Sequence, residues 1–485
     1  MVSMKKNIFY NSLFQIAVLL VPFITTPYVS RVLGAENIGK YSYATAMVTY
    51  FTLFATLGTN LYGQRKIAAC KENAKEVNRV FWNVEILRII LAILALILYG
   101  SYLFFFEGIN AINGIAAISL LNVAIDVSWL FQGLEEFKIT ALRNLLVRLG
   151  CLAGIFLFVK DQNDTWKYIL IIMLSQFMGN FSMVLSARRY VKWCGEIQPF
   201  EGFWDIVLIF LPTISIQVYT ILDKSMIGWI THSDYANGCY EQSERIARLA
   251  LSVVTSVGSV VYSRVANLFH KDDLEQARGY VYKAFQLVWL MAVPVMMGLN
   301  AVSNLFIPIF LGKDFGDAII LLKIFSALIL IVGTAHVIGV SYLIPTKQQN
   351  VYTFAVTIAA IFNFLMNLIL IPLFGALGAA IASIVAETIG TAIQLAYCFM
   401  KKQLCLTHMI KNVWKYCVAG MVMYVGVVFL RINYFSEGFG ALTILIASGV
   451  IMYLGMIILI RDSFFIEQSK NIIDNMSKIL NKKRI

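Results

Sequence analysis

Long runs of apolar residues, each bounded by charged or turn-forming residues, follow one another along nearly the whole chain. A helix needs about 20 apolar residues to cross a bilayer, and these runs reach that length. They lack the alternation of an outer-membrane barrel, so they predict helices. We therefore expect an all-α membrane protein with about 14 transmembrane helices. The predicted spans are 8–30, 40–62, 83–106, 111–133, 142–160, 168–187, 204–230, 240–263, 284–310, 318–344, 350–371, 376–400, 413–431 and 439–460.

The composition agrees with this architecture. Of the 485 residues, 59% are hydrophobic and 14% are charged, whereas soluble domains have about 45–50% apolar and about 25% charged residues. Lys and Arg outnumber Asp and Glu by 39 to 27, which in a soluble protein would suggest a nucleic-acid partner. Here most basic residues fall in alternate connections between the spans. This pattern predicts that those connections and both termini face the cytoplasm, with the bilayer as partner and no nucleic acid.

The sequence lacks the motifs of covalent chemistry. It has no P-loop, no cluster of histidines and no Gly-x-Ser-x-Gly. Asp314-Phe315-Gly316 copies a kinase triplet but has no companion motif. The seven cysteines have no spacing suited to a metal site or a disulfide framework. We expect no catalytic residues, no metal and no cofactor.

Two parts of the chain about 200 residues apart resemble each other. Gly39-Lys40-Tyr41 matches Gly238-Cys239-Tyr240 at an offset of 199, and the segments 58–62 and 258–262 match at an offset of 200. Coincidence among common membrane residues is the alternative. A true repeat of six helices predicts two lobes of the same topology around a central cavity. The predicted domains are a six-helix lobe over 1–190, a second over 204–400, two extra helices over 413–460 and a basic cytoplasmic tail over 461–485.

Ionisable groups inside spans are costly and indicate function. The basic candidates are Arg31, Arg148 and Lys224. Arg31 and Arg148 lie close enough to helix ends for their side chains to reach the headgroups, which is the alternative explanation for both. Lys224 directly follows Asp223, and neighbouring helix positions point about 100° apart, so both side chains can face a cavity.

The span over 240–263 opens with two acids and two arginines. Glu241 and Arg245, like Glu244 and Arg248, are four positions apart with the acid first, the order that favours local ion pairs. The functional alternative is that Arg245 and Arg248 face an anionic ligand.

Acids in other spans suggest ion coupling. Asp126 and Glu387 have no obvious partner on their own helices, so each is either protonated or binds a coupling cation. Glu85 and Arg88 are three positions apart, and we expect them to form a local pair.

Two blocks resemble a known family. The segment 27–42, which reads Pro-Tyr-Val-Ser-Arg-Val-Leu-Gly-Ala-Glu-Asn-Ile-Gly-Lys-Tyr-Ser, and the segment 222–228 followed by 238–246 are similar to bacterial polysaccharide flippases, the O-antigen and capsule repeat-unit transporters. Cys239 departs from the aromatic or small residue common there, and the segment 261–264 lacks a proline often found before its arginine. The resemblance extends over the whole chain in length and span pattern.

This resemblance implies a fold like that of multidrug and toxin extrusion (MATE) transporters and lipid II flippases. It also implies transport of an undecaprenyl-diphosphate-linked oligosaccharide across the bacterial cytoplasmic membrane for O-antigen, capsule or exopolysaccharide synthesis, driven by a proton or sodium gradient. A polysaccharide polymerase and a chain-length regulator are the expected protein partners. The residues expected to bind the diphosphate are Arg31, Arg148, Lys224, Arg245 and Arg248, and those expected to couple an ion are Asp126, Asp223 and Glu387.

Two other functions compete with this interpretation. A small-molecule exporter of the same superfamily would favour an acidic or apolar cavity for cationic drugs, whereas the interior basic residues here suit an anion. A membrane polysaccharide polymerase would need a sizeable outer loop with catalytic acids or arginines. The longest predicted outer connection, about 231–240, is too short for such a loop.

Overall fold

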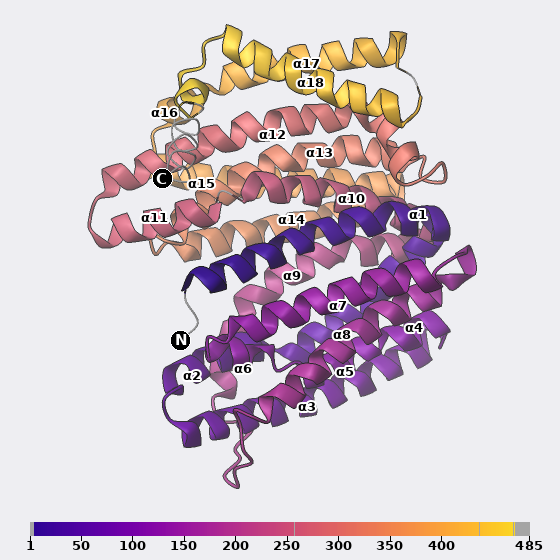
Figure 1. Cartoon of the computed structure of the whole chain (residues 1–485), viewed down its shortest axis with the longest axis vertical. Helices are drawn as coiled ribbons and strands as arrows, with labels where there is room; N and C mark the ends of the chain where they lie inside the picture. The colour runs from indigo at the N-terminus through magenta and orange to yellow at the C-terminus, as the bar shows by residue number, and fades with distance from the viewer. Residues whose placement is uncertain (1–3, 257, 436, 469, 471–485) are drawn as a thin grey trace, which may run out of the picture. The chain divides into compact units, whose positions relative to one another are not determined.

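The computed structural model describes residues 4–256, 258–435, 437–468 and 470, and these residues are almost entirely helical (Figure 1). Most of the predicted basic tail, residues 469 and 471–485, lies outside them. The chain divides into two compact units, Met1–Glu241 and Gln242–Ile485. The prediction of an all-α fold is confirmed.

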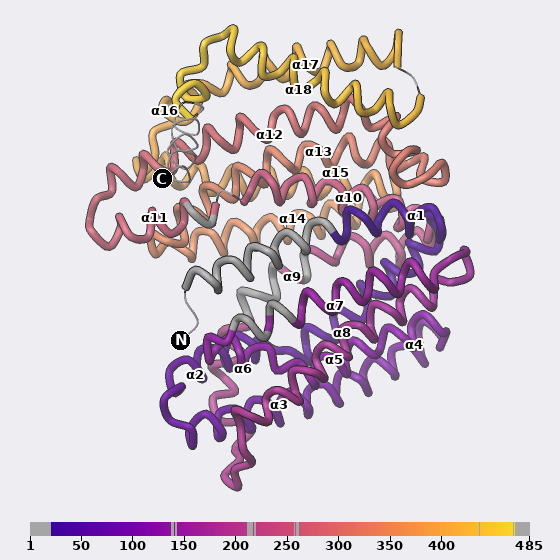
Figure 2. The backbone as a smooth tube through the Cα atoms, viewed as in Figure 1, coloured from indigo at the N-terminus to yellow at the C-terminus, as the bar shows by residue number. Residues whose placement is uncertain are grey.

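The first unit contains the helices up to the beginning of α10. They are α1 (Met4–Thr56), α2 (Thr59–Cys70), α3 (Ala74–Tyr102), the π-helical turn η1 (Leu103–Glu107), α4 (Ala111–Ala116), α5 (Ile118–Ile125), α6 (Ser128–Gly133), α7 (Phe137–Phe158), η2 (Gln162–Asp164), α8 (Thr165–Ala187), α9 (Phe203–Thr231) and α10 (Asp234–Thr255). Within this unit α1 packs against α3, α7 and α9, and α5 packs against α3 and α8 (Figure 2).

The breaks between helices differ from those predicted. The first two predicted spans are joined in α1 by one non-helical residue, Gly34, whose φ of 76° and ψ of 170° suit glycine alone. The chain turns at Gly34, so that residues 35–56 run back along the unit. The last residues of α1 lie beside α2, at the end of the unit opposite to Gly34 (Figure 1). The predicted span 40–62 is wrong at its end, because α1 stops at Thr56 and Gly58, with φ 75°, precedes α2. The predicted span 111–133 is divided into α4, α5 and α6.

The second unit continues from α10 to the C-terminus. Its further helices are α11 (Gly258–His270), α12 (Leu274–Phe310), α13 (Ala318–Ala335), the π-helical segment η3 (His336–Leu343), α14 (Gln349–Phe374), α15 (Ala376–Met400), α16 (Leu406–Ile410), α17 (Val413–Asn433) and α18 (Phe439–Leu459). Here α12 packs against α13 and α17, α14 against α15, and α17 against α18. The predicted span 240–263 is divided between α10 and α11.

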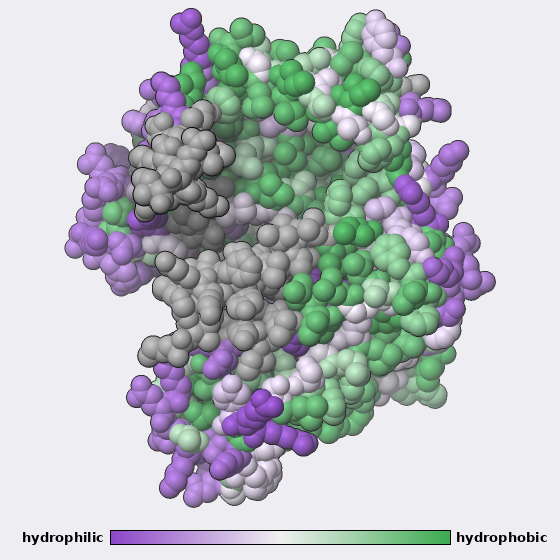
Figure 3. Space-filling model, in the orientation of Figure 1, coloured by the Kyte–Doolittle hydropathy of each residue, from purple (hydrophilic) through white to green (hydrophobic). Residues whose placement is uncertain are grey.

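Apolar surface covers the middle of the helices in both units. On the visible face, hydrophobic side chains occupy the central part of each unit and hydrophilic ones gather at the helix ends (Figure 3). Within the described residues, nine helices are long and apolar enough to cross a membrane. The chain is therefore a multi-pass membrane protein, and the total of 14 spans stays a prediction.

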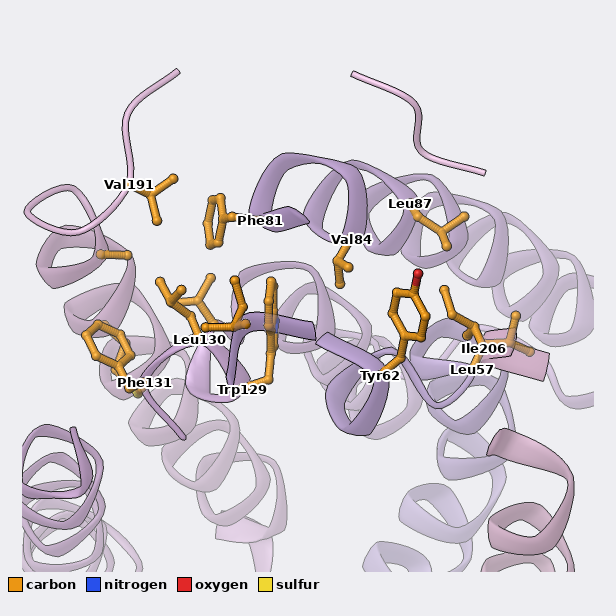
Figure 4. Close-up of a cluster of buried hydrophobic side chains, with 14 of the residues drawn as sticks. Leu57, Tyr62, Phe81, Val84, Leu87, Trp129, Leu130, Phe131, Val191 and Ile206 are labelled. Atoms are coloured by element: carbon orange, nitrogen blue, oxygen red, sulfur yellow. The ribbon is translucent and has the colours of Figure 1, made fainter. Parts of the chain in front are cut away.

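An aromatic and aliphatic core fills one end of the first unit. Trp129 and Phe131 are fully buried there together with Ile67 and Leu87 (Figure 4). The rings of Phe81 and Trp129 stack with centroids 5.6 Å apart, an arrangement that adds about 0.5–1.5 kcal/mol to the contribution of buried area. This core joins α2, α3, α6 and the beginning of α9, so it holds the end of the unit that carries the predicted cytoplasmic connections.

Candidate functional site

An ion pair lies between the two helices that end the first unit. The Nζ atom of Lys224, on α9, is 2.6 Å from Oε2 of Glu241, on α10, and the two side chains are 20% and 11% exposed. Asp223 precedes Lys224 but points in another direction, because consecutive helix positions are about 100° apart. Glu241 thus has an ion-pair partner on another helix, which its local spacing does not suggest.

Hydroxyl groups complete this cluster. Tyr240 donates to Oδ2 of Asp223 at 2.5 Å, and Ser42 of α1 donates to Oε2 of Glu241 at 3.2 Å. We call Ser42, Asp223, Lys224, Tyr240 and Glu241 the α1–α9–α10 cluster. Each of its carboxylates accepts hydrogen bonds from another helix, which compensates for the loss of water around a buried charge.

Two glycines allow α1 and α10 to approach closely enough for these contacts. A Cβ atom at Gly39 would lie 1.7 Å from the backbone oxygen of Asp234, and one at Gly238 would lie 1.9 Å from the backbone oxygen of Ala35. No real Cβ contact is that short, so the two backbones touch where only glycine fits.

Two residue pairs at this crossing have the offset of the internal repeat predicted from the sequence. Gly39 and Gly238 are 199 residues apart, and so are Ser42 and Glu241, which are joined by a hydrogen bond. Sequence analysis did not identify Ser42, Tyr240 or Glu241 as members of one site. The offset of 199 was the signal that could have paired Ser42 with Glu241.

A separate cavity of about 480 Å³ in the first unit contains Asp126 and Arg88. Arg88 is 1% exposed and donates to Oδ1 of Asn60 at 2.6 Å and to the backbone oxygen of Val123 at 2.8 Å. Asp126 follows α5, and its Oδ1 accepts a hydrogen bond from the backbone of Ser128 at 3.0 Å. The other polar groups that line this cavity come from Thr49, Thr52, Thr56, Ser119, Asn122, Gln176, Asn180 and Gln217.

The expected local pair of Glu85 and Arg88 is wrong. Within the described residues no ion pair joins them, because Arg88 reaches groups of α2 and α5 instead. Glu85 is 6% exposed, and its Oε2 has no hydrogen-bond partner in the described part of the chain. Sequence analysis therefore missed Arg88 as a residue of a polar cavity, since its partners are distant in sequence.

Two further predicted basic residues belong to the first unit. Arg31 is an exposed residue of α1, three positions before the turn at Gly34. Arg148 is half-buried on α7.

The other predicted residues belong to the second unit. Arg245 is half-buried on α10. Arg248 makes the local ion pair that its spacing predicts, with Nη2 2.6 Å from Oε1 of Glu244. Glu387 is half-buried on α15. Of the predicted set, Asp223 and Lys224 belong to the α1–α9–α10 cluster, and Asp126 lines the cavity of about 480 Å³ in the same unit.

Fold and site define a multi-pass helical membrane protein with charged and polar groups inside its helical bundle, the arrangement of a membrane transporter. More particularly, the chain belongs to the polysaccharide biosynthesis protein family, whose model matches residues 4–269. This confirms the family indicated by the two sequence blocks.

Relatives of similar length carry names from surface-glycan synthesis. The chain is 24% identical over 408 residues to the "Putative O-antigen transporter" of Escherichia coli (strain K12), a match that covers 81% of this chain and 96% of that protein. It is 21% identical over 383 residues to the "Probable low-salt glycan biosynthesis flippase Agl15" of Haloferax volcanii, covering 77% and 79%.

Solved structures confirm the MATE-like fold. The lipid II flippase MurJ in an inward closed conformation aligns with a TM-score of 0.74 at 18% identity, over 93% of this chain and 99% of that one. An inward-facing multidrug resistance MATE family transporter of the MOP superfamily aligns with a TM-score of 0.58 at 12% identity, over 79% and 98%.

Proposed function

We propose that this protein is a flippase that moves an undecaprenyl-diphosphate-linked oligosaccharide from the inner to the outer leaflet of the bacterial cytoplasmic membrane. Membership of the polysaccharide biosynthesis family supports this proposal. So do the names of the relatives, an O-antigen transporter and a glycan biosynthesis flippase, which match most of the chain. Translocation breaks no covalent bond, so the proposal needs no catalytic residue.

The observation that carries the proposal is the environment of Lys224. Its ammonium group lies within the helical bundle, 20% exposed, and its charge is balanced by Glu241 at 2.6 Å. A diphosphate is a strong acceptor for such a partly desolvated cation. A cationic drug, in contrast, would be repelled by Lys224.

Substrate binding then proceeds by exchange of anions at Lys224. A diphosphate oxygen takes the place of the Glu241 carboxylate, and Ser42, which donates to the same Oε2 atom, becomes available to the ligand. Arg31, Arg148, Arg245 and Arg248 are proposed to contact the diphosphate during other parts of its passage, with Arg providing forked donors. Exchange keeps the lysine paired, and the main cost of the step is that the Glu241 carboxylate loses its cation.

Ion coupling is proposed for Asp126, Asp223 and Glu387, with a proton or sodium ion as the coupling ion. Asp126 is supported by its place in the cavity of about 480 Å³, where hydroxyl and amide groups can solvate a cation. Asp223 is supported by its short hydrogen bond from Tyr240 within the α1–α9–α10 cluster. A proton that arrives at Asp223 would weaken this bond between α9 and α10, because a neutral carboxyl group is a weaker acceptor than a carboxylate.

The orientation in the membrane and the protein partners follow from the same proposal. Both termini lie in the cytoplasm, as the distribution of basic residues predicts. The flipped oligosaccharide is passed in the outer leaflet to a polysaccharide polymerase under the control of a chain-length regulator, for O-antigen, capsule or exopolysaccharide.

The test is flipping of a defined lipid-linked oligosaccharide in proteoliposomes under imposed proton or sodium gradients. We expect flipping by the wild type, a loss of at least tenfold in Lys224→Ala, and partial retention in Lys224→Arg, which keeps the charge. Lys167→Ala is the matched control, because Lys167 also pairs with an acid, Asp164, at 2.5 Å but lies at the beginning of α8 and is 37% exposed. Full flipping by Lys224→Ala, or efflux of organic cations without flipping, would overturn the proposal.

A further inference from the structure

A larger cavity of about 810 Å³ lies in the first unit, apart from the residues of the α1–α9–α10 cluster. Three parts of the chain line it: the middle of α1, the region from the end of α3 to the beginning of α4, and the turn between α9 and α10. Its volume is within the range of about 300–1,000 Å³ that is typical of sites for small ligands. Its lining differs from that of the cavity around Asp126, because aromatic rings contribute much of it.

One carboxylate is held in a fixed position in this cavity. Tyr43 donates to Oε1 of Glu107 at 2.5 Å, and Tyr102 donates to the same atom at 2.8 Å. Oε2 of Glu107 accepts no hydrogen bond from any described residue, and the carboxylate has capacity for about two more. Glu107 is the last residue of the π-helical turn η1, and such turns occur frequently at functional sites.

Aromatic faces lie around this acceptor. Phe106 is 81% exposed and Trp229 is 66% exposed, and both line the cavity with Tyr43. Lipid-facing rings are common in membrane proteins, but these rings share one cavity with a fixed carboxylate and with the amide of Asn110. Apolar faces beside a few oriented acceptors and donors match a sugar ring, which has C–H faces and hydroxyl edges.

The basic residue of this cavity is less suited to a phosphate ligand than Lys224 is. The charged residues of the cavity, apart from His232, are Lys40, Glu107 and Asp234. Lys40 is moreover paired with Glu36 at 2.8 Å. The side chain of Lys40 is 38% exposed, against 20% for Lys224, so its charge is better solvated and less available to a diphosphate, whereas an uncharged polyhydroxylated ligand needs no cation.

The position of the cavity relates it to transport. It lies at the ends of helices joined by the connections 108–110 and 232–233, which the distribution of basic residues predicts to face outward. We propose that this cavity is a carbohydrate-binding subsite, which receives uncharged sugar rings of the lipid-linked oligosaccharide on the outer side of the membrane. This inference rests on the proposed flippase function and adds to it a second subsite, separate from the cation that binds the diphosphate.

The test uses full-length protein in nanodiscs and a water-soluble probe. The probe is the free repeat-unit oligosaccharide, released from the host's own surface polysaccharide and lacking lipid and phosphate. Binding is measured by saturation-transfer NMR. We expect Trp229→Ala and Glu107→Gln to weaken binding at least tenfold. Trp204→Ala is the matched control, because Trp204 is also on α9 and is 74% exposed but lies at the other end of that helix, and we expect it to bind within twofold of the wild type.

Several results would overturn the subsite. These are no binding by the wild type, equal binding by Trp229→Ala and Trp204→Ala, or binding of tetraphenylphosphonium in place of the sugar. Trp229→Phe, which keeps an aromatic face, should recover binding and thereby separates recognition from misfolding. Flipping by the same variants is measured in proteoliposomes, so the two proposals fail separately. Flipping without Trp229-dependent sugar binding removes the subsite alone, and sugar binding without flipping removes the flippase function alone.

Discussion

Replacing Gly39 with alanine should separate α1 from α10. The added Cβ would lie 1.7 Å from the backbone oxygen of Asp234, whereas real Cβ atoms essentially never approach closer than 3.0 Å. The difference requires the two backbones to move apart by about 1.3 Å along this contact. The obstacle is backbone, so no flexible side chain can move to make room. Gly238→Ala creates the equivalent contact at 1.9 Å from Ala35 and should behave alike.

The magnitude follows from the cost of overpacking. Inserting a methyl group into a tightly packed site costs about 1–3 kcal/mol. Each 1.4 kcal/mol changes an equilibrium tenfold, so the crossed arrangement of α1 and α10 should lose about 5- to 150-fold in relative population. The hydrogen bond between Ser42 and Glu241, at 3.2 Å, lies one turn from Gly39 and would lengthen with the separation.

The assay uses Cys239, which is fully buried next to Gly238. With the other six cysteines replaced, the rate of N-ethylmaleimide labelling reports how often α10 separates from its neighbours. Gly39→Ala should accelerate labelling at least fivefold. Gly100→Ala is the control, since a Cβ there meets nothing within 4 Å. Equal labelling rates in the two variants, both monodisperse in detergent, would refute the argument that the backbones touch at this crossing.

Two further predictions concern single groups. Lys224→Met should lower the free energy of unfolding by about 2–4 kcal/mol, because it leaves Glu241 without its cation. The double variant that also carries Glu241→Gln should recover at least half of that loss. Additive losses of the two single variants in thermal denaturation would contradict the ion pair. The exposed thiol of Cys405 has its pKa lowered to about 6 by hydrogen bonds with Thr407 and His408, so it is mostly thiolate at pH 7 and its alkylation rate should level off above about pH 7. Thr407→Val should move this inflection to higher pH, and an unchanged profile would contradict the assigned cause.

The sequence predicted the helices well and their breaks poorly. Apolar runs mark where helices lie, because a segment that crosses the bilayer must be apolar over the full thickness of the hydrocarbon core. They carry no signal for a turn at a single residue, so the continuity of α1 through Gly34 was not predicted. The division of 111–133 into three helices was missed for the same reason, because all three pieces are apolar.

The site could be predicted only residue by residue. The rule that charges inside spans indicate function selected Lys224 and Asp223, and the structure places both in one cluster. Their partners are Glu241 and Tyr240, which lie 17 residues further along the chain and on another helix. Local spacing favours partners three or four positions away, so it also assigned Arg88 to Glu85, although Arg88 binds groups of other helices.

The turn at Gly34 has a consequence for how movement passes through the protein. Helical segments usually meet through loops, which absorb small displacements and let each segment shift on its own. The two halves of α1 are joined by a single non-helical residue, so no loop separates them. We therefore expect a displacement of residues 4–33 to move residues 35–56, which carry Gly39 and Ser42. Lengthening this joint by a few flexible residues would uncouple the two halves mechanically while leaving every contact of the α1–α9–α10 cluster able to form.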